Sequence, residues 1–304
     1  MLDSLEYCAN IKNLEGPAQN PTFKLVKGNI RSADLVRHVL LTENIDTIMH
    51  FAAETHVDNS FGNSFTFTET NVLGTHVLLE AIRLSKTVRR FVHVSTDEVY
   101  GEASFHGSSS LESDSMLAPT NPYSASKAAA EMLVIAYGTS YNLQYLITRG
   151  NNVYGPRQFP EKAIPKFIHL LHRGQKIPIH GNGLALRSYM HVSDAAAAFD
   201  CILHKGENQG IYNIGAQEER TIMSVARVRV DTWFLNFLLI CIFKDLCKIF
   251  KKEDTEQLEH VTDRAFNDRR YFVDSSKLEK LGWKQEKEWA VGLVRFINVC
   301  STPD

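Results

Sequence analysis

The sequence predicts an α/β fold, in which a doubly wound parallel sheet is followed by a smaller C-terminal lobe, and two observations predict it. Runs with strand character alternate with runs of helical apolar spacing through the first half of the chain, which favours a parallel sheet with helices on both faces. After residue 155 the pattern loosens, because glycines and prolines break the chain into short elements. We therefore expect a sheet domain over residues 1–155 and a loop-rich lobe over residues 156–304.

The expected strands are short β-branched and apolar runs, and the expected helices repeat apolar residues at helical spacing. In chain order we expect strands at Phe23–Ile30, Thr47–Ala53, Arg90–Ser95 and Tyr145–Thr148, and helices at Ala33–Thr42, Thr70–Ser85 and Pro122–Tyr141. Sheets of this kind bind ligands beyond the carboxyl ends of their strands. That rule predicts chemistry at Ala52–Thr55, Thr96–Glu98 and Gly150–Asn152.

Composition and charge argue against several functional classes. Of the 304 residues, 44% are hydrophobic and 22% are charged, and the formal net charge is −2. These values are ordinary for a globular enzyme, and with no basic excess we expect neither a nucleic-acid partner nor a membrane partner. The cysteines match no zinc motif and the histidines form no His-Glu-x-x-His pair, so we expect reduced thiols and no metal site.

Two segments bear on targeting and on membrane insertion. Met1–Glu6 carries acids where a signal peptide has a basic stretch and an apolar run, so we expect no signal peptide and a cytoplasmic protein. The apolar run Trp233–Phe243 is too short to cross about 30 Å of hydrocarbon as a helix.

Two short motifs contain residue types suited to catalysis. Ser95–Gly101 places two adjacent carboxylates directly after an expected strand, and Tyr123–Lys127 places tyrosine and lysine on one face of a helix. A nearby ammonium stabilises phenolate, so the tyrosine pKa should fall below its usual value of about 10. Such a tyrosine can take a proton from a sugar hydroxyl as hydride leaves for NAD⁺. Each motif alone also fits a solvated turn or an exposed helical pair, but their order after strands of one sheet favours catalysis.

These motifs belong to a set that resembles the dTDP-glucose 4,6-dehydratases, a family of extended short-chain dehydrogenase/reductases with a Rossmann-like fold. The stretches that carry the resemblance are His50–Asp58, Asn71–Thr75, Ser95–Gly101, Asn121–Lys127, Arg149–Pro156, Phe159–Lys162 and Asp268–Tyr271. The similarity runs from Asp3 to about Arg227 and again from about Lys244 to Trp283. It implies an NAD-dependent lyase that converts dTDP-glucose to dTDP-4-keto-6-deoxyglucose and water.

The resemblance implies a role for each residue of the two motifs. Thr96 would hold the sugar 4-hydroxyl, and Tyr123 would be the base during oxidation at C4, with Lys127 bonding the nicotinamide ribose. Glu98 would remove the C5 proton that the 4-keto group acidifies, and Asp97 would protonate the departing 6-hydroxyl. Two neighbouring carboxylates suit this elimination, because mutual repulsion can separate an ionised base from a protonated acid.

The resemblance also implies residues that bind the cofactor and the substrate. The residues that would contact NAD are Asp3, Asn29, Ile30, Phe51, Ala52, Ala53, Glu54, Thr55, Thr70, Tyr123, Lys127 and Val153. The residues that would contact the nucleotide sugar are Thr55, Thr96, Asn152, Lys162, Arg187, Asn213 and Arg264. Arginine suits the diphosphate because its planar fork binds oxygen atoms in pairs, although any one arginine also fits a surface ion pair.

The sequence departs from the family pattern at three places. It contains no Gly-x-x-Gly-x-x-Gly loop, which the family has upstream of the position of Asp3 and which binds the cofactor pyrophosphate. We therefore expect weaker cofactor binding and weaker unaided folding. Residues 228–243 have no family counterpart, and fit either an unspliced in-frame intron or an extra buried helix. Asp263–Asn267 replaces the usual Asp-Arg-Pro-Gly-His of the substrate loop.

Several alternatives remain open at this point. UDP-glucose 4,6-dehydratase is the nearest one, since Arg149–Pro156 suits both substrates. Epimerases and UDP-glucuronate decarboxylases share the Tyr-x-x-x-Lys pattern, but the Asp97–Glu98 pair favours dehydration. A non-catalytic remnant that keeps the side chains but binds no cofactor is a different class. Family analogy further implies a homodimer through helices near Thr70–Ser85 and Ala128–Tyr141.

Overall fold

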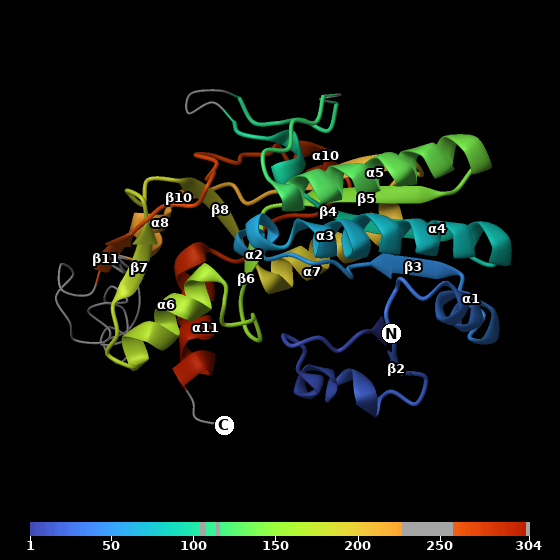
Figure 1. Ribbon diagram of the computed structural model, residues 1–304, viewed down its shortest axis with the longest axis horizontal. Helices are drawn as coiled ribbons and strands as arrows, with labels where there is room; N and C mark the ends of the chain where they lie inside the picture. Colours follow the sequence, from blue (N-terminus) through green and yellow to red (C-terminus); the bar gives the residue numbers. More distant parts are fainter. Residues whose placement is uncertain (104–107, 114–115, 227–257, 302–304) are drawn as a thin grey trace. The chain divides into compact units, whose positions relative to one another are not determined.

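The computed structural model describes residues 1–103, 108–113, 116–226 and 258–301 (Figure 1). The predicted insertion at residues 228–243 lies outside the described residues. The chain divides into two compact units. The first comprises residues 1–101, 112–150 and 201–213, and the second comprises residues 102–111, 151–200 and 214–304. The boundary at residues 200–201 falls within one helix, α7 (Val192–Lys205).

The first unit alternates strands and helices as the sequence predicts. Its strands are β1 (Leu2–Asp3), β2 (Val26–Lys27), β3 (Thr47–His50), β4 (Arg90–Thr96), β5 (Tyr145–Gly150) and β9 (Gly210–Ile214). Its helical segments are η1 (Ile11–Leu14), η2 (Pro17–Gln19), α1 (Ala33–Thr42), α2 (Val57–Gly62), α3 (Ser64–Phe67), η3 (Thr68–Leu73), α4 (Gly74–Ser85), η4 (Asp97–Tyr100) and α5 (Pro122–Tyr141). The predicted bounds of α1 and α5 are confirmed.

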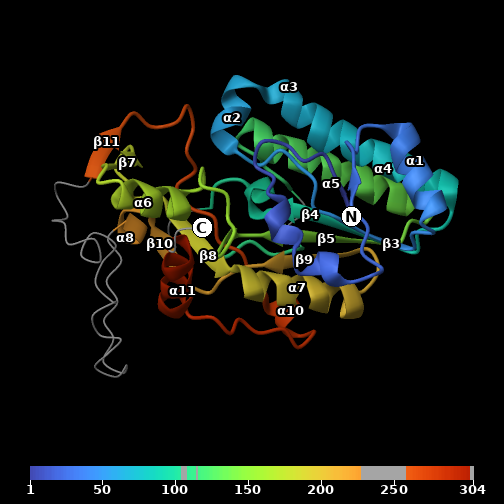
Figure 2. The ribbon, with the colours of Figure 1, turned by 90° about the horizontal axis from the view of Figure 1, so that it is seen from below.

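A sheet with the strand order β3-β4-β5-β9 forms the centre of this unit. β4 pairs in parallel with β3 on one side and with β5 on the other, so the carboxyl ends of these strands meet at one edge. The helices α1, α4 and α5 cover one face, and the part of α7 from Cys201 onward lies on the other (Figure 2). The predicted arrangement of helices on both faces of a parallel sheet is thus confirmed.

The core of this unit lies between the sheet and the helices α1, α4 and α5. The buried residues of this cluster are Ile30, Val36, Leu40, Leu78, Leu79, Ala81, Ile82, Phe91, Val134, Tyr137, Leu143, Tyr145 and Ile147. Burying one such aliphatic or aromatic side chain contributes roughly 1.5–3 kcal/mol. This packing fixes the positions of β3, β4 and β5, whose carboxyl ends precede the segments predicted to carry the chemistry.

Two predicted strands are shorter in the structure than the sequence indicates. β2 pairs only with β1, in a two-stranded parallel ladder that joins Leu2 to Val26 and Asp3 to Lys27, so the predicted strand Phe23–Ile30 shrinks to two residues. The predicted strand Thr47–Ala53 ends at His50, the last residue of β3 that pairs with β4.

The predicted helix Thr70–Ser85 begins differently from the prediction. Residues Thr68–Leu73 form a π-helical turn, in which the Gly74 N–H bonds to the Glu69 carbonyl five residues back, before α4 continues as a regular helix. Such turns are rare and occur often at functional sites. Glycine fits at position 74 because a Cβ there would lie 2.6 Å from the Ile30 side chain. The π turn rotates Asn71 into the interior of the unit, where it is 2% exposed.

The second unit has two small sheets with helices packed around them. Its elements are β6 (Asn152–Tyr154), α6 (Ala163–His172), β7 (Ile177–His180), β8 (Leu186–His191), β10 (Glu219–Thr221), α8 (Ile222–Ala226), β11 (Leu258–Val261), α10 (Ser276–Glu279) and α11 (Trp289–Ser301). β8 lies between β10 and β6, and β11 pairs in parallel with β7. The core includes Phe167, Ile168, Ile179 and Leu293.

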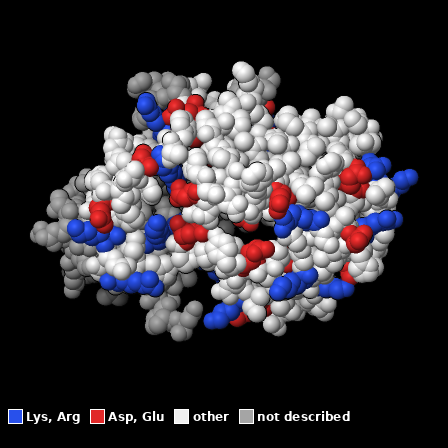
Figure 3. Space-filling model, in the orientation of Figure 1, with Lys and Arg blue, Asp and Glu red and all other residues white. Residues whose placement is uncertain are grey.

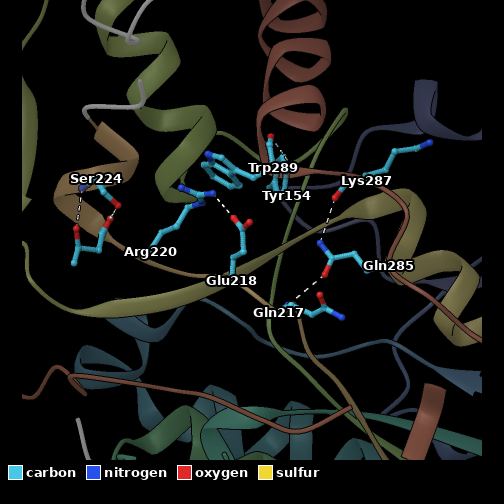
Figure 4. A network of polar contacts seen from close by, with 9 residues as sticks. Tyr154, Gln217, Glu218, Arg220, Ser224, Gln285, Lys287 and Trp289 are labelled. Carbon is cyan, nitrogen blue, oxygen red and sulfur yellow. Dashed lines mark hydrogen bonds and ion pairs between the residues drawn. The ribbon is translucent and has the colours of Figure 1, made fainter. Parts of the chain in front are cut away.

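Aromatic and polar contacts attach the start of α11 to this unit (Figure 4). The Arg220 guanidinium lies 5.0 Å from the centre of the Trp289 ring and is paired with Glu218. The Tyr154 hydroxyl donates a hydrogen bond to the Trp289 carbonyl at 3.3 Å. Gln285 links Gln217 to Lys287 through two further bonds. The C-terminal helix is therefore an integral part of the second unit.

Charged side chains show no segregation by sign on the face seen in Figure 3, where Lys and Arg are interspersed with Asp and Glu. Among the helices of the described residues, none is both long enough and apolar enough to span a membrane.

Candidate active site

The turn after β4 places a hydroxyl and two carboxylates at the carboxyl edge of the central sheet. Thr96 is the last residue of β4, and its side-chain oxygen accepts a hydrogen bond from the Glu98 N–H at 3.3 Å. The same hydroxyl donates to Asp97 Oδ1 at 3.2 Å. Thr96 and Asp97 are 6% and 3% exposed, whereas Glu98 is half-buried. The two adjacent carboxylates therefore differ in their surroundings, as an acid and a base should.

Asn121 connects this turn to the start of α5. Its Nδ2 donates a hydrogen bond to Glu98 Oε2 at 3.0 Å, and its Oδ1 accepts one from the Ser124 N–H at 2.9 Å. The second bond is half of a capping box, completed by the Asn121 N–H donating to Ser124 Oγ at 3.2 Å. The cap and the turn share one side chain, so the Glu98 carboxylate is held beside the helix end that carries Tyr123.

The expected lowering of the Tyr123 pKa is wrong for this structure. Burial raises the pKa of Tyr123, and the negative charges of Glu98 and Asp97 raise it further, while a hydrogen bond with Thr96 acts in the opposite direction. Lys127 is not among the groups that shift it. The helical spacing of the two residues was predicted correctly, but the carboxylates after β4 lie near the phenol and outweigh the lysine.

Lys127 is instead directed at the backbone of the sheet. Its Nζ donates a hydrogen bond to the Val94 carbonyl at 2.5 Å, and burial lowers the pKa of Lys127 from 10.5 to about 8, against an opposing effect of Glu131. His50 and His93 are paired across β3 and β4, with ring centres 5.4 Å apart. Burial and the Lys127 charge lower the pKa of both, that of His50 to about 3, so both rings are neutral at pH 7.

A buried ion pair lies one turn further along α5. Arg149, in the last part of β5, binds Glu131 through its Nε and Nη2, and the Arg149 Nη2 to Glu131 Oε2 distance is 2.7 Å. The Arg149 guanidinium stacks on the Tyr100 ring at 4.7 Å, and the Tyr100 hydroxyl donates to Asn213 Oδ1 at 2.8 Å. These contacts run from α5 through the turn after β4 to β9. They bring the predicted substrate residue Asn213 to that turn.

The predicted cofactor segment Phe51–Thr55 follows β3 at the same edge of the sheet. Phe51 is 52% exposed, Ala52 and Thr55 are also exposed, and Ala53 and Glu54 are half-buried. Asn71 holds the segment, because its side chain accepts from the Glu54 N–H at 2.8 Å and donates to the Glu54 carbonyl at 3.0 Å. Asn71 thus holds the backbone of the segment at Glu54, and Phe51, Ala52 and Thr55 keep exposed surface.

The other predicted cofactor residues of the first unit lie at the ends of β1 and β2 and on η3. Asp3 Oδ1 accepts from the Leu5 N–H at 2.8 Å, and Asn29 Oδ1 accepts from the Arg31 N–H at 2.9 Å. Ile30 is 7% exposed, and its side chain belongs to the core. Thr70 is half-buried on the π turn.

In the second unit, the structure brings Arg187 and the loop at residues 263–267 together. Arg187 Nη2 donates to Asn267 Oδ1 at 3.1 Å, and Asn267 Nδ2 donates to Asp263 Oδ1 at 3.0 Å. The pKa of the buried Tyr189 is raised to about 12 because burial outweighs the opposing charges of Arg187 and Arg264. Asn267, at the position where the family has histidine, therefore joins Arg187 to Asp263, which also accepts a hydrogen bond from the Arg264 N–H.

The remaining predicted residues of this unit lie on β6 and before α6. Asn152 and Val153 are exposed on β6, and Val153 is 37% exposed. Lys162 is the N-cap residue of α6, and its Nζ lies 3.8 Å from a Glu161 carboxylate oxygen. The structure thus places Thr96, Asp97, Glu98, Tyr123 and Lys127 in the first unit, and Asn152, Val153, Lys162, Arg187 and Arg264 in the second.

Four residues that support the cluster were not predicted as site residues from the sequence. They are Asn71, Tyr100, Asn121 and Glu131. Asn71 and Asn121 stand inside the motifs that carried the resemblance, which is the only signal that could have found them. Their partners lie 17 and 23 residues away along the chain, beyond the reach of local spacing arguments.

Comparison with known proteins identifies the family to which the sequence is similar. The sequence matches the family model described as GDP-mannose 4,6 dehydratase over residues 1–294. It is 55% identical over 298 residues to a trifunctional UDP-glucose 4,6-dehydratase/UDP-4-keto-6-deoxy-D-glucose 3,5-epimerase/UDP-4-keto-L-rhamnose-reductase of Arabidopsis thaliana. That match covers 98% of this chain but only 42% of the plant protein, so the chain spans less than half of that relative's length.

Two further similar proteins are named as dehydratases of dTDP-glucose. The chain is 42% identical over 304 residues to dTDP-D-glucose 4,6-dehydratase of Homo sapiens, covering 98% of this chain and 80% of the human protein. The crystal structure of DesIV, a dTDP-glucose 4,6-dehydratase from Streptomyces venezuelae with NAD bound, superposes with a TM-score of 0.86 at 38% identity. This match covers 98% of this chain and 85% of DesIV, and it confirms the predicted Rossmann-like fold.

Proposed function

The chain belongs to the GDP-mannose 4,6 dehydratase family, and we propose that it is an NAD-dependent nucleotide-sugar 4,6-dehydratase. The observation that carries the proposal is the turn Thr96–Glu98, in which one hydroxyl and two carboxylates lie beside Tyr123 at a strand end. Epimerisation needs the tyrosine but has no use for a base and an acid together. The two carboxylates in unlike surroundings therefore favour elimination of water.

The residues present fit a nicotinamide dinucleotide. Small and apolar side chains with exposed surface follow β3, where a flat ring can cover them, and an acidic residue, Asp3, ends β1, where a ribose would be bound. The residues proposed to hold NAD are Asp3, Asn29, Ile30, Phe51–Thr55, Thr70, Tyr123, Lys127 and Val153. A dinucleotide held there would supply the hydride acceptor for oxidation at C4 and the hydride donor for C6, and its positive charge would oppose the raised pKa of Tyr123.

The chain's own residues would divide the proton transfers among them. Thr96 would hold the substrate 4-hydroxyl and Tyr123 would take its proton, leaving a ketone at C4. Glu98 would then take the C5 proton, which the ketone acidifies. The C6–O bond would break with a proton supplied by Asp97, so that water leaves. The proton on Glu98 returns to C5, and the product is a 4-keto-6-deoxy sugar with no net change in redox state.

The cationic residues of the second unit are proposed to bind the diphosphate. Arg187 and Arg264 present guanidinium groups, which bind phosphate oxygens in pairs. Lys162 supplies a point charge, and Asn152, with Thr55 and Asn213 of the first unit, would hydrogen-bond the sugar. The bond between Asn267 and Arg187 supports this role, since it fixes the arginine by a neutral group that leaves its charge unneutralised.

For the nucleotide, we propose UDP-glucose ahead of dTDP-glucose. The identity of 55% to the plant protein named for UDP-glucose exceeds the identity of 42% to the human protein named for dTDP-glucose. The dTDP-glucose prediction from the sequence remains a second candidate, supported by the structural match to DesIV.

A homodimer is proposed on the basis of the outer surface of α5. The only charged residues of this helix, Lys127 and Glu131, are buried, and Figure 3 shows few charged side chains over it. Met132 and Tyr141 are 49% and 55% exposed on α5, and Leu84 on the neighbouring α4 is 51% exposed. An outer surface of α5 that exposes no charged side chain, with the apolar Leu84 beside it on α4, suits a partner helix. Light scattering should give twice the chain mass, and Met132→Glu should give the monomer.

The function is tested by incubating the chain with NAD⁺ and either UDP-glucose or dTDP-glucose, and detecting the 4-keto-6-deoxy product by nuclear magnetic resonance. A second version carries an upstream Gly-x-x-Gly-x-x-Gly segment. Faster product formation from UDP-glucose supports the proposal. Faster formation from dTDP-glucose supports the substrate predicted from the sequence. Absence of product from both versions would contradict dehydration and support a non-catalytic protein.

A further inference from the structure

The side-chain amide of Asn121 makes one hydrogen bond through its oxygen and another through its nitrogen. The first bond is to α5 and the second is to the turn after β4. Its oxygen caps α5 by accepting from the Ser124 N–H at 2.9 Å, and its nitrogen donates to Glu98 Oε2 at 3.0 Å. The side chain is 6% exposed, so solvent does not substitute for either partner. One buried amide therefore joins the cap of the helix that carries Tyr123 to a carboxylate of the catalytic turn.

The orientation of this amide follows from chemistry. A backbone N–H can only donate, so the end of Asn121 that meets Ser124 must be the oxygen. The NH₂ group is then directed at Glu98, and a carboxylate accepts from it. The capping box thus determines which end faces the carboxylate, and a residue that caps equally well without an NH₂ group would leave Glu98 without this donor.

The Glu98 carboxylate is the group whose position matters most for elimination. The Glu98 backbone is held by Thr96 at 3.3 Å, but the longer side chain reaches beyond that anchor and is half-buried. A glutamate has three side-chain torsions, and a base must lie within hydrogen-bond reach of the proton that it removes. The Asn121 bond restricts those torsions relative to α5, on which Tyr123 also sits.

We propose that Asn121 is a positioning residue for Glu98 in the elimination step, and that this role is separate from its role as a helix cap. The inference rests on the proposed function, in which Glu98 takes the C5 proton. Asn121 touches neither the substrate nor the reacting atoms in this account; it acts through the Glu98 carboxylate.

Three substitutions separate the two roles of Asn121. Serine and aspartate cap helices about as well as asparagine, whereas alanine does not. Serine and alanine lack the NH₂ donor, and aspartate replaces it by a negative charge facing Glu98. A role in capping alone predicts that Asn121→Ser and Asn121→Asp resemble the parent and that Asn121→Ala is impaired. A positioning role predicts that Asn121→Ser and Asn121→Ala are impaired alike and that Asn121→Asp is worst.

Two readouts isolate the step that Glu98 performs. The first is exchange of the C5 proton of the 4-keto-6-deoxy product in D₂O, which needs a base but no hydride transfer. The second is the near-ultraviolet absorbance of reduced nicotinamide in a single turnover, which rises with oxidation at C4 and falls after elimination. Thermal unfolding of each variant measures the cap, and Glu98→Gln is the reference for loss of the base.

We expect Asn121→Ser to slow C5 exchange and the decay of the reduced nicotinamide by about tenfold to a hundredfold, while the rise of the absorbance is unchanged. Asn121→Asp should slow them further, because it places a second carboxylate against Glu98. Parent-like exchange in both variants would overturn the proposal, as would equal slowing of oxidation and elimination. If Glu98→Gln exchanges C5 normally, the base assignment itself fails, which distinguishes an error in the proposed function from an error about Asn121.

Discussion

The turn after β4 and the segment after β3 lie at the same edge of one parallel sheet, but the chain holds them differently. Asp97 in the first is 3% exposed, and the side chains of Thr96 and Glu98 are held by hydrogen bonds. Phe51 in the second is 52% exposed, and the Asn71 contacts with Glu54 hold only the backbone there. The comparison teaches that the groups proposed to react are largely buried and held by hydrogen bonds, whereas the segment proposed for the cofactor is held at the Glu54 backbone and keeps more exposed side-chain surface.

The largest effect should follow from removing the phenol at the buried turn. Tyr123→Phe should lower kcat for 4-keto-6-deoxy product formation by about 10²–10⁴-fold, the usual contribution of a positioned proton-transfer group. Tyr137→Phe is the matched control, because Tyr137 is also buried on α5 but its hydroxyl bonds to Glu80. We expect the control to retain full kcat. Retention of more than about a tenth of the parent rate by Tyr123→Phe would exclude the assigned base.

The next largest effect concerns the ion pair that supports the turn through Tyr100. Arg149→Ala should lower the free energy of unfolding by about 3–5 kcal/mol, because Glu131 would stay buried without a partner. The double variant Glu131→Met/Arg149→Met removes both charges and should recover most of that loss. Denaturant unfolding of both variants measures the difference. A double variant no more stable than the single one would show that the buried charges do not dominate this region.

The sequence predicted the elements of the first unit better than it predicted the contacts between side chains. The bounds of α1 and α5 follow from apolar spacing and from Pro122, and both are confirmed. The shortness of β2 could not be predicted, because a ladder depends on its partner and β1 supplies only two residues. The π turn at Thr68–Leu73 has no period that a helical pattern would reveal.

For the candidate site, the residues of the turn could be named from the sequence, but their electrostatics could not. The spacing of Tyr123 and Lys127 predicted a lowered tyrosine pKa, yet burial raises that pKa and the charges of Glu98 and Asp97 raise it further. That outcome depends on the distance between α5 and the turn after β4, which no local pattern contains. The bond from Asn121 to Glu98 depends on the same packing.

A smaller effect should appear as a pH dependence of stability from Lys127. Since burial lowers its pKa from 10.5 to about 8, the unfolded chain binds more protons than the folded chain between these pH values. Stability therefore rises with pH across this window, by an amount on the order of 3 kcal/mol from this residue. Lys127→Met should lack that rise when unfolding is measured at pH 7.5, 9 and 10.5. Parallel pH profiles for parent and variant would contradict a buried ammonium.

The smallest effect should come from the open segment. Phe51→Ala should change the free energy of unfolding by less than about 0.5 kcal/mol, because the ring is half exposed, but should weaken NAD⁺ binding by about tenfold. Leu41→Ala, which removes a 49% exposed side chain on α1, is the control and should leave binding unchanged. Titration calorimetry measures both. A large loss of stability with unchanged NAD⁺ affinity would reverse the contrast between the two segments.

The most direct test of the account follows the hydrogen atom at C4. UDP-glucose carrying deuterium at C4 is incubated with the chain and unlabelled NAD⁺ in ordinary water, and the product is examined by nuclear magnetic resonance. Oxidation at C4, elimination across C5 and C6, and return of hydride to C6 predict a 4-keto-6-deoxy product with deuterium at C6 and none at C4 or C5. A product that keeps its 6-hydroxyl and carries deuterium at a C4 of inverted configuration would contradict dehydration and indicate an epimerase.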